Sequence, residues 1–160
     1  MMSTTTPRLT VELVPATCWW SNLRTLLPKR EWDRIRHDIY AKAGNRCDIC
    51  GGSGLRWPVE CHERWRYDGA THIQYLDGLI ALCPRCHQCK HLGHTQIIGL
   101  LDVALDHLAR VNGWDADTTD AYVSDAFAQW RERSEHKWTL DATTLADQYG
   151  IALELPADAA

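Results

Sequence analysis

Residues 83–91 read CPRCHQCKH, and this short segment carries four side chains that can bind a transition metal. Cys83 and Cys86 have the CxxC spacing of a zinc knuckle, and His87 and His91 follow them directly. A tetrahedral zinc ion takes four ligands, so these residues belong either to one site or to two neighbouring sites. The rest of the chain decides between these alternatives.

A second CxxC pair, Cys47 and Cys50, lies upstream in the segment CDICGGSG, where glycines permit a tight turn. Two such pairs, separated by a strand hairpin, supply the four thiolates of a closed structural zinc site. In a reducing compartment this spacing favours metal over disulfides. We therefore expect a structural Zn²⁺ that is bound by Cys47, Cys50, Cys83 and Cys86.

Because the four cysteines would fill the coordination sphere of that zinc ion, His87 and His91 can bind a second ion. They stand four residues apart on an expected helix, so both imidazoles project from one face. The upstream segment VECHERW offers Cys61 and His62 as further ligands. Adjacent strand residues point to opposite faces, so both reach one site only where the strand bends or ends. The open alternative is that His62 binds the ion and Cys61 is merely packed.

Hydrophobic patterns and turn residues place these ligands on defined elements. We predict a short strand at 8–15, a helix at 28–44 and a hairpin whose first strand spans about 57–64 and whose second ends near 82. A helix then runs from Pro84 to about Gly93. Further elements are expected in the second half: helices at 95–113 and 117–135, a short strand at 136–140 and a turn at 142–150. The fold class is therefore α+β.

Charge is divided unevenly along the 160 residues. Residues 1–95 carry 13 Lys and Arg against 9 Asp and Glu, whereas residues 96–160 carry 4 against 12. The basic half contains the cysteines, which suits a polyanionic ligand, although a solvated charged face gives the same pattern. No long apolar run or signal-like N-terminus is present, so we expect a cytoplasmic location without membrane contact.

Taken together, the knuckle, the strand that carries Cys61 and His62, the LCxxCHxxxH segment and its helix resemble the HNH endonuclease family over residues 44–94. The resemblance implies a ββα-metal core and metal-dependent hydrolysis of DNA, with RNA as the alternative substrate, to a 5′-phosphate and a 3′-hydroxyl. It further implies that His62 is the general base. Cys61, His87 and His91 would then hold the catalytic ion, which can be Zn²⁺, Ni²⁺, Mn²⁺ or Mg²⁺.

On this interpretation the chain divides into a mobile tail (1–8), a zinc-stabilised HNH-like domain with an N-terminal strand and helix (9–95) and a helical extension packed on it (96–155). Basic residues around the site are expected to hold phosphates: Arg56, Arg64, Arg66, Arg85 and Lys90. Four tryptophans can stack on unpaired bases or fill the core: Trp19, Trp20, Trp57 and Trp65. His72, in the expected hairpin loop, can meet the metal or the substrate, or be solvated.

Two residues depart from the family pattern. The position of its middle Asn falls on Gly78, and Cys61 stands where Asp or His is usual, although a thiolate suits Mg²⁺ poorly. The alternative function is therefore a non-catalytic zinc module that binds nucleic acid or a protein. Its acidic C-terminal half would then be the surface that binds a basic partner. No motif in the chain indicates its oligomeric state or a preferred nucleic-acid sequence.

Overall fold

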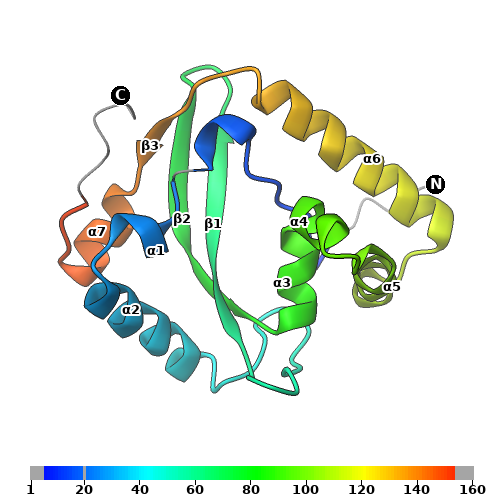
Figure 1. The fold of residues 1–160 in the computed structure, drawn as a ribbon, viewed down its shortest axis with the longest axis horizontal. Helices are drawn as coiled ribbons and strands as arrows, with labels where there is room; N and C mark the ends of the chain where they lie inside the picture. The colour runs from blue at the N-terminus through cyan, green and yellow to red at the C-terminus, as the bar shows by residue number, and fades with distance from the viewer. Residues whose placement is uncertain (1–5, 20, 154–160) are drawn as a thin grey trace.

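The computed structural model describes residues 6–19 and 21–153. The candidate stacking residue Trp20 and most of the expected tail, residues 1–5, lie outside the described part. The described chain is α+β, with seven α-helices, one short 3-10 helix and a three-stranded sheet (Figure 1). Its helices are η1 Ala16–Cys18, α1 Leu23–Leu26, α2 Lys29–Lys42, α3 Pro84–Lys90, α4 Leu92–Ile97, α5 Leu101–Asn112, α6 Ala116–Arg133 and α7 Thr143–Tyr149.

The predicted hairpin is confirmed and forms the centre of the molecule. Strand β1 (Glu60–Asp68) pairs antiparallel with β2 (Ile73–Leu82), and β3 (Thr139–Asp141) joins β2 in parallel. The first strand lies a few residues later than predicted, because Pro58 precedes it and its backbone cannot extend the ladder. A bulge between Arg64 and Trp65 shifts the register halfway along the hairpin.

Helices cover the hairpin on two sides, and each side has its own apolar core (Figure 1). On one side Leu23, Ile35 and Leu76 are buried between α1, α2, α7 and β2. On the other side Leu82, Leu92 and Leu108 pack with buried cysteines between β2 and helices α3 to α5. The expected extension thus supplies one wall of the core that surrounds the cysteines.

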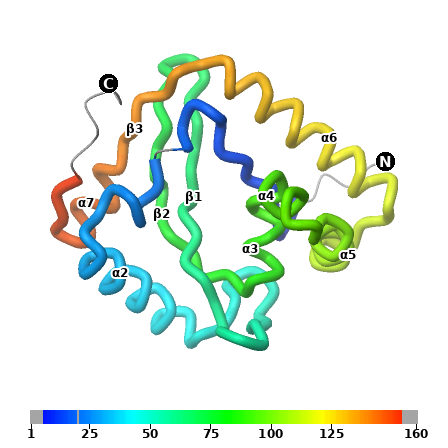
Figure 2. Tube along the Cα trace, in the orientation of Figure 1, coloured from blue at the N-terminus to red at the C-terminus, as the bar shows by residue number. Residues whose placement is uncertain are grey.

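The predicted strand at 8–15 is wrong. Asn112 of α5 bonds both the N–H and the C=O of Leu9, and the Tyr122 hydroxyl of α6 accepts the N–H of Val11 at 3.1 Å. Among the described residues, the segment has only one backbone bond to a distant segment, from the N–H of Glu12 to the Lys90 carbonyl at 3.1 Å, so side chains take the place of a strand partner and no ladder forms. Figure 2 shows it running from the α5–α6 side up to the hairpin, where η1 follows it.

Two helix boundaries also differ from the predictions. The helix that begins at Pro84 ends at Lys90, because His91 leaves helical geometry (φ −106°, ψ 53°) before α4 begins. The helix predicted at 95–113 is interrupted by Gly99 in the left-handed region (φ +77°), so Ile97 is 83% exposed instead of lying in an apolar stripe. No helix among the described residues is long and apolar enough to cross a bilayer.

Candidate metal centres

Four cysteines form a compact cluster between the knuckle and the start of α3. The sulfur atoms of Cys47, Cys50, Cys83 and Cys86 all lie within 4.8 Å of one another. Backbone N–H groups point at these sulfurs, as in the contact from Cys50 to Cys47 at 3.5 Å and from Cys86 to Cys83 at 3.4 Å. The cluster can therefore hold a metal ion, and its donor set is that of a structural zinc site.

The knuckle is shaped by glycine and tied to the hairpin. Gly51 is left-handed (φ +74°), and a side chain on Gly54 would approach the Trp57 carbonyl to 2.2 Å. Asp48 accepts the N–H of Ala81 through its side chain at 3.0 Å and donates its own N–H to the Ala81 carbonyl at 2.9 Å. These contacts fix Cys47 and Cys50 against the strand that leads into Cys83.

Gly78 lies in the bulge, opposite Arg64. A Cβ added to Gly78 would lie 3.1 Å from the Arg64 guanidinium, so a larger side chain at this position would displace that arginine. The bonds between Asp48 and Ala81 connect the knuckle to β2.

Protonation of the metal-free thiols is unequal. Hydrogen bonds with Cys83 and Cys86 lower the pKa of Cys47. Hydrogen bonds with Cys47 and Cys83 raise the pKa of Cys86. The hydrogen bond with Cys47 raises the pKa of Cys83 to about 11. A single thiolate is thus stabilised by its neighbours and opposes further ionisation. A bound dication is what allows the remaining thiols to ionise, so the residues fit a zinc ion.

His107, which no sequence motif indicates, lies behind the cysteines. Its Nε2 is 3.2 Å from the Cys86 sulfur, and its Nδ1 is 3.2 Å from an Nη of Arg110. A guanidinium can only donate, so Nδ1 accepts and Nε2 carries the hydrogen that is donated to sulfur. Burial and the charge of Arg110 lower the pKa of His107, which keeps the ring neutral.

A second cluster contains three histidines, which come from β1, from α3 and from the junction of α3 and α4. The ring nitrogens of His62, His87 and His91 lie within 4.8 Å of one another, and the three ring centroids are 4.8 to 5.3 Å apart. His62 comes from β1, His87 from α3 and His91 from the junction of α3 and α4. This cluster can also hold a metal ion.

Carboxylates behind two of the rings set their tautomers. The Nε2 of His62 lies 2.7 Å from Glu12, and the Nδ1 of His87 lies 2.6 Å from Glu60. The pKa of Glu12 is lowered to about 2 because the bonds to His62 and the charge of Lys90 outweigh burial, and the bond from His87 lowers the pKa of Glu60. Ionised carboxylates only accept, so the rings donate to them and turn the lone pairs of the opposite nitrogens toward the cluster.

The lowered pKa values of His62 and His91 favour neutral rings. Burial lowers the pKa of His91 to about 3 and also lowers the pKa of His62, which is 2% exposed. A neutral imidazole is the form that binds a metal ion or accepts a proton.

Cys61 is not among the residues that cluster with His87 and His91, and His62 takes that place. Cys61 lies on the opposite face of β1, toward Arg36 of α2, because neighbouring strand residues alternate. Burial, with the charge of Glu63, raises its pKa to about 12, so the thiolate that a metal requires is disfavoured there. His62 therefore faces the cluster, whereas Cys61 lies outside it, half-buried in the lining of a cleft that the three histidines share.

Lys90 was predicted to hold phosphate, but its side chain is buried and only 4% exposed. The ammonium donates to Glu12 at 2.9 Å and to Thr10 at 2.6 Å. It therefore compensates the charge of the carboxylate behind His62 and is not available to a ligand. Glu12 lies in a segment without a motif, which is why sequence reasoning missed it.

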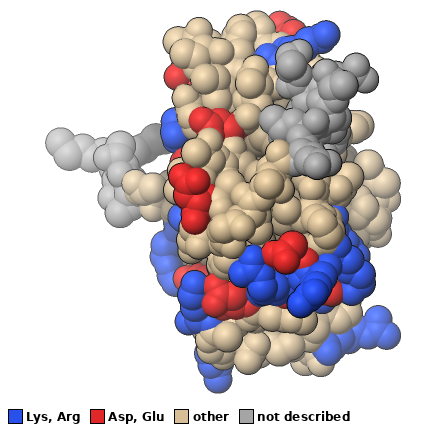
Figure 3. All heavy atoms as spheres, turned by 90° about the vertical axis from the view of Figure 1, so that its left-hand side faces the viewer, with Lys and Arg blue, Asp and Glu red and all other residues tan. Residues whose placement is uncertain are grey.

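A cleft of about 590 Å³ opens in front of the histidine cluster, and the three histidines lie in its lining. Its opposite wall carries the basic residues Arg24, Lys29 and Arg36 from α1 and α2. Asp33 pairs with both Lys29 and Arg36, whereas no ion pair of Arg24 is found in the described chain. Figure 3 shows basic side chains interspersed with acidic ones on the face where α2 lies.

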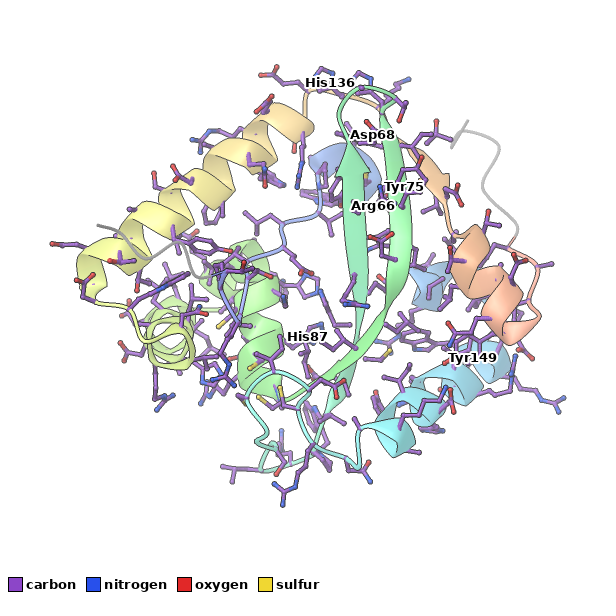
Figure 4. The ribbon with its side chains drawn as sticks, turned by 180° about the vertical axis from the view of Figure 1, so that it is seen from behind. Arg66, Asp68, Tyr75, His87, His136 and Tyr149 are labelled. Atoms are coloured by element: carbon purple, nitrogen blue, oxygen red, sulfur yellow. The ribbon has the colours of Figure 1, made fainter. Side chains whose placement is uncertain are left out.

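The predicted phosphate contacts Arg56, Arg64, Arg66 and Arg85 are exposed but line no part of this cleft. Figure 4 shows Arg66 well along the hairpin from His87, where it pairs with Asp77 and lies 4.2 Å from the Tyr75 ring centroid. His72 lies at the hairpin turn and stacks on His136, with ring centroids 4.5 Å apart. His72 thus lies apart from the histidine cluster.

The three histidines, their carboxylates and the basic wall come from segments that are distant in sequence, and only His87 and His91 share a motif. A cysteine cluster and a histidine cluster, each able to hold a metal ion, therefore flank one short helix. Comparisons with protein-family models, curated proteins and solved structures found no match to this chain, so the chemistry of these two clusters carries the functional inference.

Proposed function

We propose that the chain is a metal-dependent endonuclease that hydrolyses DNA phosphodiester bonds at the histidine cluster. The observation that carries this proposal is the convergence of three histidines, two of them oriented by carboxylates, in a cleft with a basic wall. The order β1, β2, α3 with these ligands also resembles the ββα-metal arrangement of the HNH family. Cys47, Cys50, Cys83 and Cys86 would hold a structural zinc ion beside it.

His62 is suited to two roles, and the contact with Glu12 serves both. With its Nε2 hydrogen bonded to the carboxylate, the lone pair on Nδ1 faces the cluster. That nitrogen either binds the ion or takes a proton from water, with Glu12 stabilising the resulting imidazolium. As the water oxygen bonds to phosphorus, the bond from phosphorus to the 3′ oxygen breaks.

His87 and His91 are the remaining ligands in the proposal. A divalent ion held there supplies positive charge that stabilises the developing charge on the phosphate. A set of no more than three protein ligands is typical of catalytic and not of structural sites. Across the cleft, Arg24 is placed to hold a neighbouring phosphate, since its guanidinium has no recorded acidic partner in the described residues.

The test is cleavage of supercoiled plasmid and of single-stranded DNA with Mg²⁺, Mn²⁺, Ni²⁺, Co²⁺ and Zn²⁺ in turn. We expect metal-dependent cutting by the wild-type protein and a loss of at least about 100-fold in His62→Ala and His87→Ala. His37→Ala, an exposed histidine on α2, is the matched control and should cut normally. Unchanged cutting by His62→Ala and His87→Ala would contradict the proposal.

Metal affinity separates the two roles of His62. If His62 is a ligand, His62→Ala weakens binding of the second ion; if it is the base, binding persists while cleavage is lost. Calorimetric titration of protein that already holds one zinc ion measures this affinity.

A second candidate function is a zinc module that binds nucleic acid or a protein without catalysis. It is favoured by the packed Cys61 and by the excess of acidic residues in the second half of the chain. A folded protein with one or two zinc ions that cuts no DNA with any tested ion would support it.

A further inference from the structure

A pocket of about 540 Å³ lies next to the histidine cluster and plays no part in the chemistry described above. Its walls come from the N-terminal segment, β1, α4 and α6. Aromatic side chains dominate these walls: Trp19, Trp65, Phe127 and Trp130. Its size is within the range of pockets that enclose a small organic ring system.

The pocket and the cleft share three lining residues, Asn22, Glu63 and His91. His91 belongs to the histidine cluster, so the aromatic walls begin where the proposed metal site ends. The walls of the pocket carry no Lys or Arg, whereas the cleft has Arg24, Lys29 and Arg36. One side is therefore suited to a flat uncharged ring and the other to an anion.

Polar groups at this junction can contact the edge of such a ring. Asn22 caps α1 through its side-chain oxygen, which accepts the N–H of Thr25 at 2.9 Å, and its amide N–H groups are not used in that bond. Glu63 accepts the N–H of Leu23 and lines both the pocket and the cleft. Polar groups of this kind orient a bound ring, while the aromatic faces supply stacking.

Trp19 is the wall that a ligand can reach most directly. Its side chain is 68% exposed, yet its indole N–H is fixed by the carbonyl of Val14 at 3.2 Å. The same carbonyl accepts the indole N–H of Trp130 at 2.9 Å, so one backbone group holds two aromatic walls. An exposed but fixed indole is a stacking surface with little conformational entropy to lose.

We propose that this aromatic pocket takes an unpaired nucleobase next to the phosphate held at the histidine cluster. The inference rests on the proposed function and adds its substrate class: single-stranded DNA, or duplex that is locally opened. Fully paired duplex must first release a base, which costs a few kcal/mol. A peptide is disfavoured as the ligand because the pocket adjoins a basic cleft that suits phosphate.

Binding tests the pocket separately from catalysis. Fluorescence anisotropy with zinc-loaded protein compares a labelled single-stranded oligonucleotide, the same strand with an abasic site at each position in turn, and the blunt duplex. We expect one abasic position to weaken binding about tenfold or more, the duplex to bind weakly, and Trp19→Ala to weaken binding of the intact strand similarly. Leu55→Ala, which removes an exposed apolar side chain outside the pocket, should bind like the wild type.

The combination of Trp19→Ala with the critical abasic site should cost little more than either alone, because both remove the same stacking contact. Equal binding of intact, abasic and duplex DNA would overturn the nucleobase assignment, and so would binding of peptides but of no oligonucleotide. Cleavage by the wild type is measured separately from binding. Equal cutting of every DNA form would contradict the nucleobase pocket but support the proposed nuclease function. Preferential binding of the intact single strand without any cleavage would support the nucleobase pocket and contradict the nuclease function.

Discussion

The cysteine cluster and the histidine cluster draw ligands from the same short helix, α3, but their surroundings differ. The four cysteines complete a tetrahedral set among themselves and lie in an apolar core with Leu82 and Leu92. The three histidines complete no such set and line a cleft of about 590 Å³. Four protein ligands are typical of a structural metal site, and three are typical of a catalytic one. We therefore expect the cysteine cluster to stabilise the fold and the histidine cluster to carry the reaction.

The clusters also differ in what sets the protonation of their side chains. Among the cysteines, thiols oppose one another's ionisation: the pKa of Cys47 is lowered, whereas the pKa values of Cys83 and Cys86 are raised. Among the histidines, Glu12 and Glu60 fix two rings in one tautomer, with lone pairs already facing the cluster. Folding of the first site should therefore depend on its metal, whereas the second should be formed before its metal binds.

The largest expected effect is the loss of one zinc thiolate. Cys83→Ser removes both a ligand and the sulfur that caps the start of α3. Because zinc binding and folding are coupled, we expect zinc loss and a Tm lower by roughly 10 °C or more. Thermal unfolding followed by circular dichroism, with zinc content by mass spectrometry, measures both, and Cys61→Ser is the matched control that should retain zinc. A Cys83→Ser protein with unchanged Tm would remove the distinction between the clusters.

The next largest effect concerns the support behind His62. Lys90→Met removes the buried ammonium that pairs with the half-buried carboxylate of Glu12, and breaking a buried pair typically costs about 3–5 kcal/mol. A fall in Tm of about 10 °C is expected for a chain of this size. Adding Glu12→Gln to Lys90→Met should recover part of that loss, because the unpaired charge is then removed. Additive losses in the double variant would show that the pair is not coupled.

Much of the fold follows from local sequence signals. Gly44, in the left-handed region, ends α2 as predicted, and the hairpin and the cysteine cluster follow from alternation and CxxC spacing. The strand predicted at 8–15 failed because apolar alternation describes any extended segment that packs on a core. Whether it joins a ladder depends on distant partners such as Asn112.

The histidine site was predicted only in part for the same reason. Spacing identified His87 and His91, but the choice between Cys61 and His62 depends on which face of β1 meets α3. Glu12 and Arg24 reach the site through tertiary packing and carry no local motif. The predicted phosphate contact Lys90 looked like a surface cation, because sequence alone does not show that a carboxylate is buried beside it.

A smaller effect is expected from Glu60→Gln at the histidine cluster. The amide can still accept a bond from His87, but it lacks the charge that fixes the ring and raises its basicity. We expect metal affinity at this site to fall about 10- to 100-fold, with the cysteine-bound zinc retained and Tm little changed. Calorimetric titration measures the affinity, and Asp77→Asn, an exposed carboxylate on the hairpin, is the control. Loss of the cysteine-bound zinc in Glu60→Gln would mean that the clusters are not independent.

The smallest expected effect is at His107, the neutral donor behind Cys86. His107→Leu removes one N–H bond to sulfur, and a hydrogen bond of this kind contributes about 1 kcal/mol, so Tm should fall by about 2–4 °C with zinc still bound. Zinc transfer to a coloured chelator should also become a few-fold faster, because the Cys86 thiolate is more easily protonated without its donor. His107→Gln can donate to the same sulfur and should restore much of the slow transfer. If both variants release zinc at the wild-type rate, His107 only fills space, and the cysteine cluster depends on its four thiolates and backbone N–H groups alone.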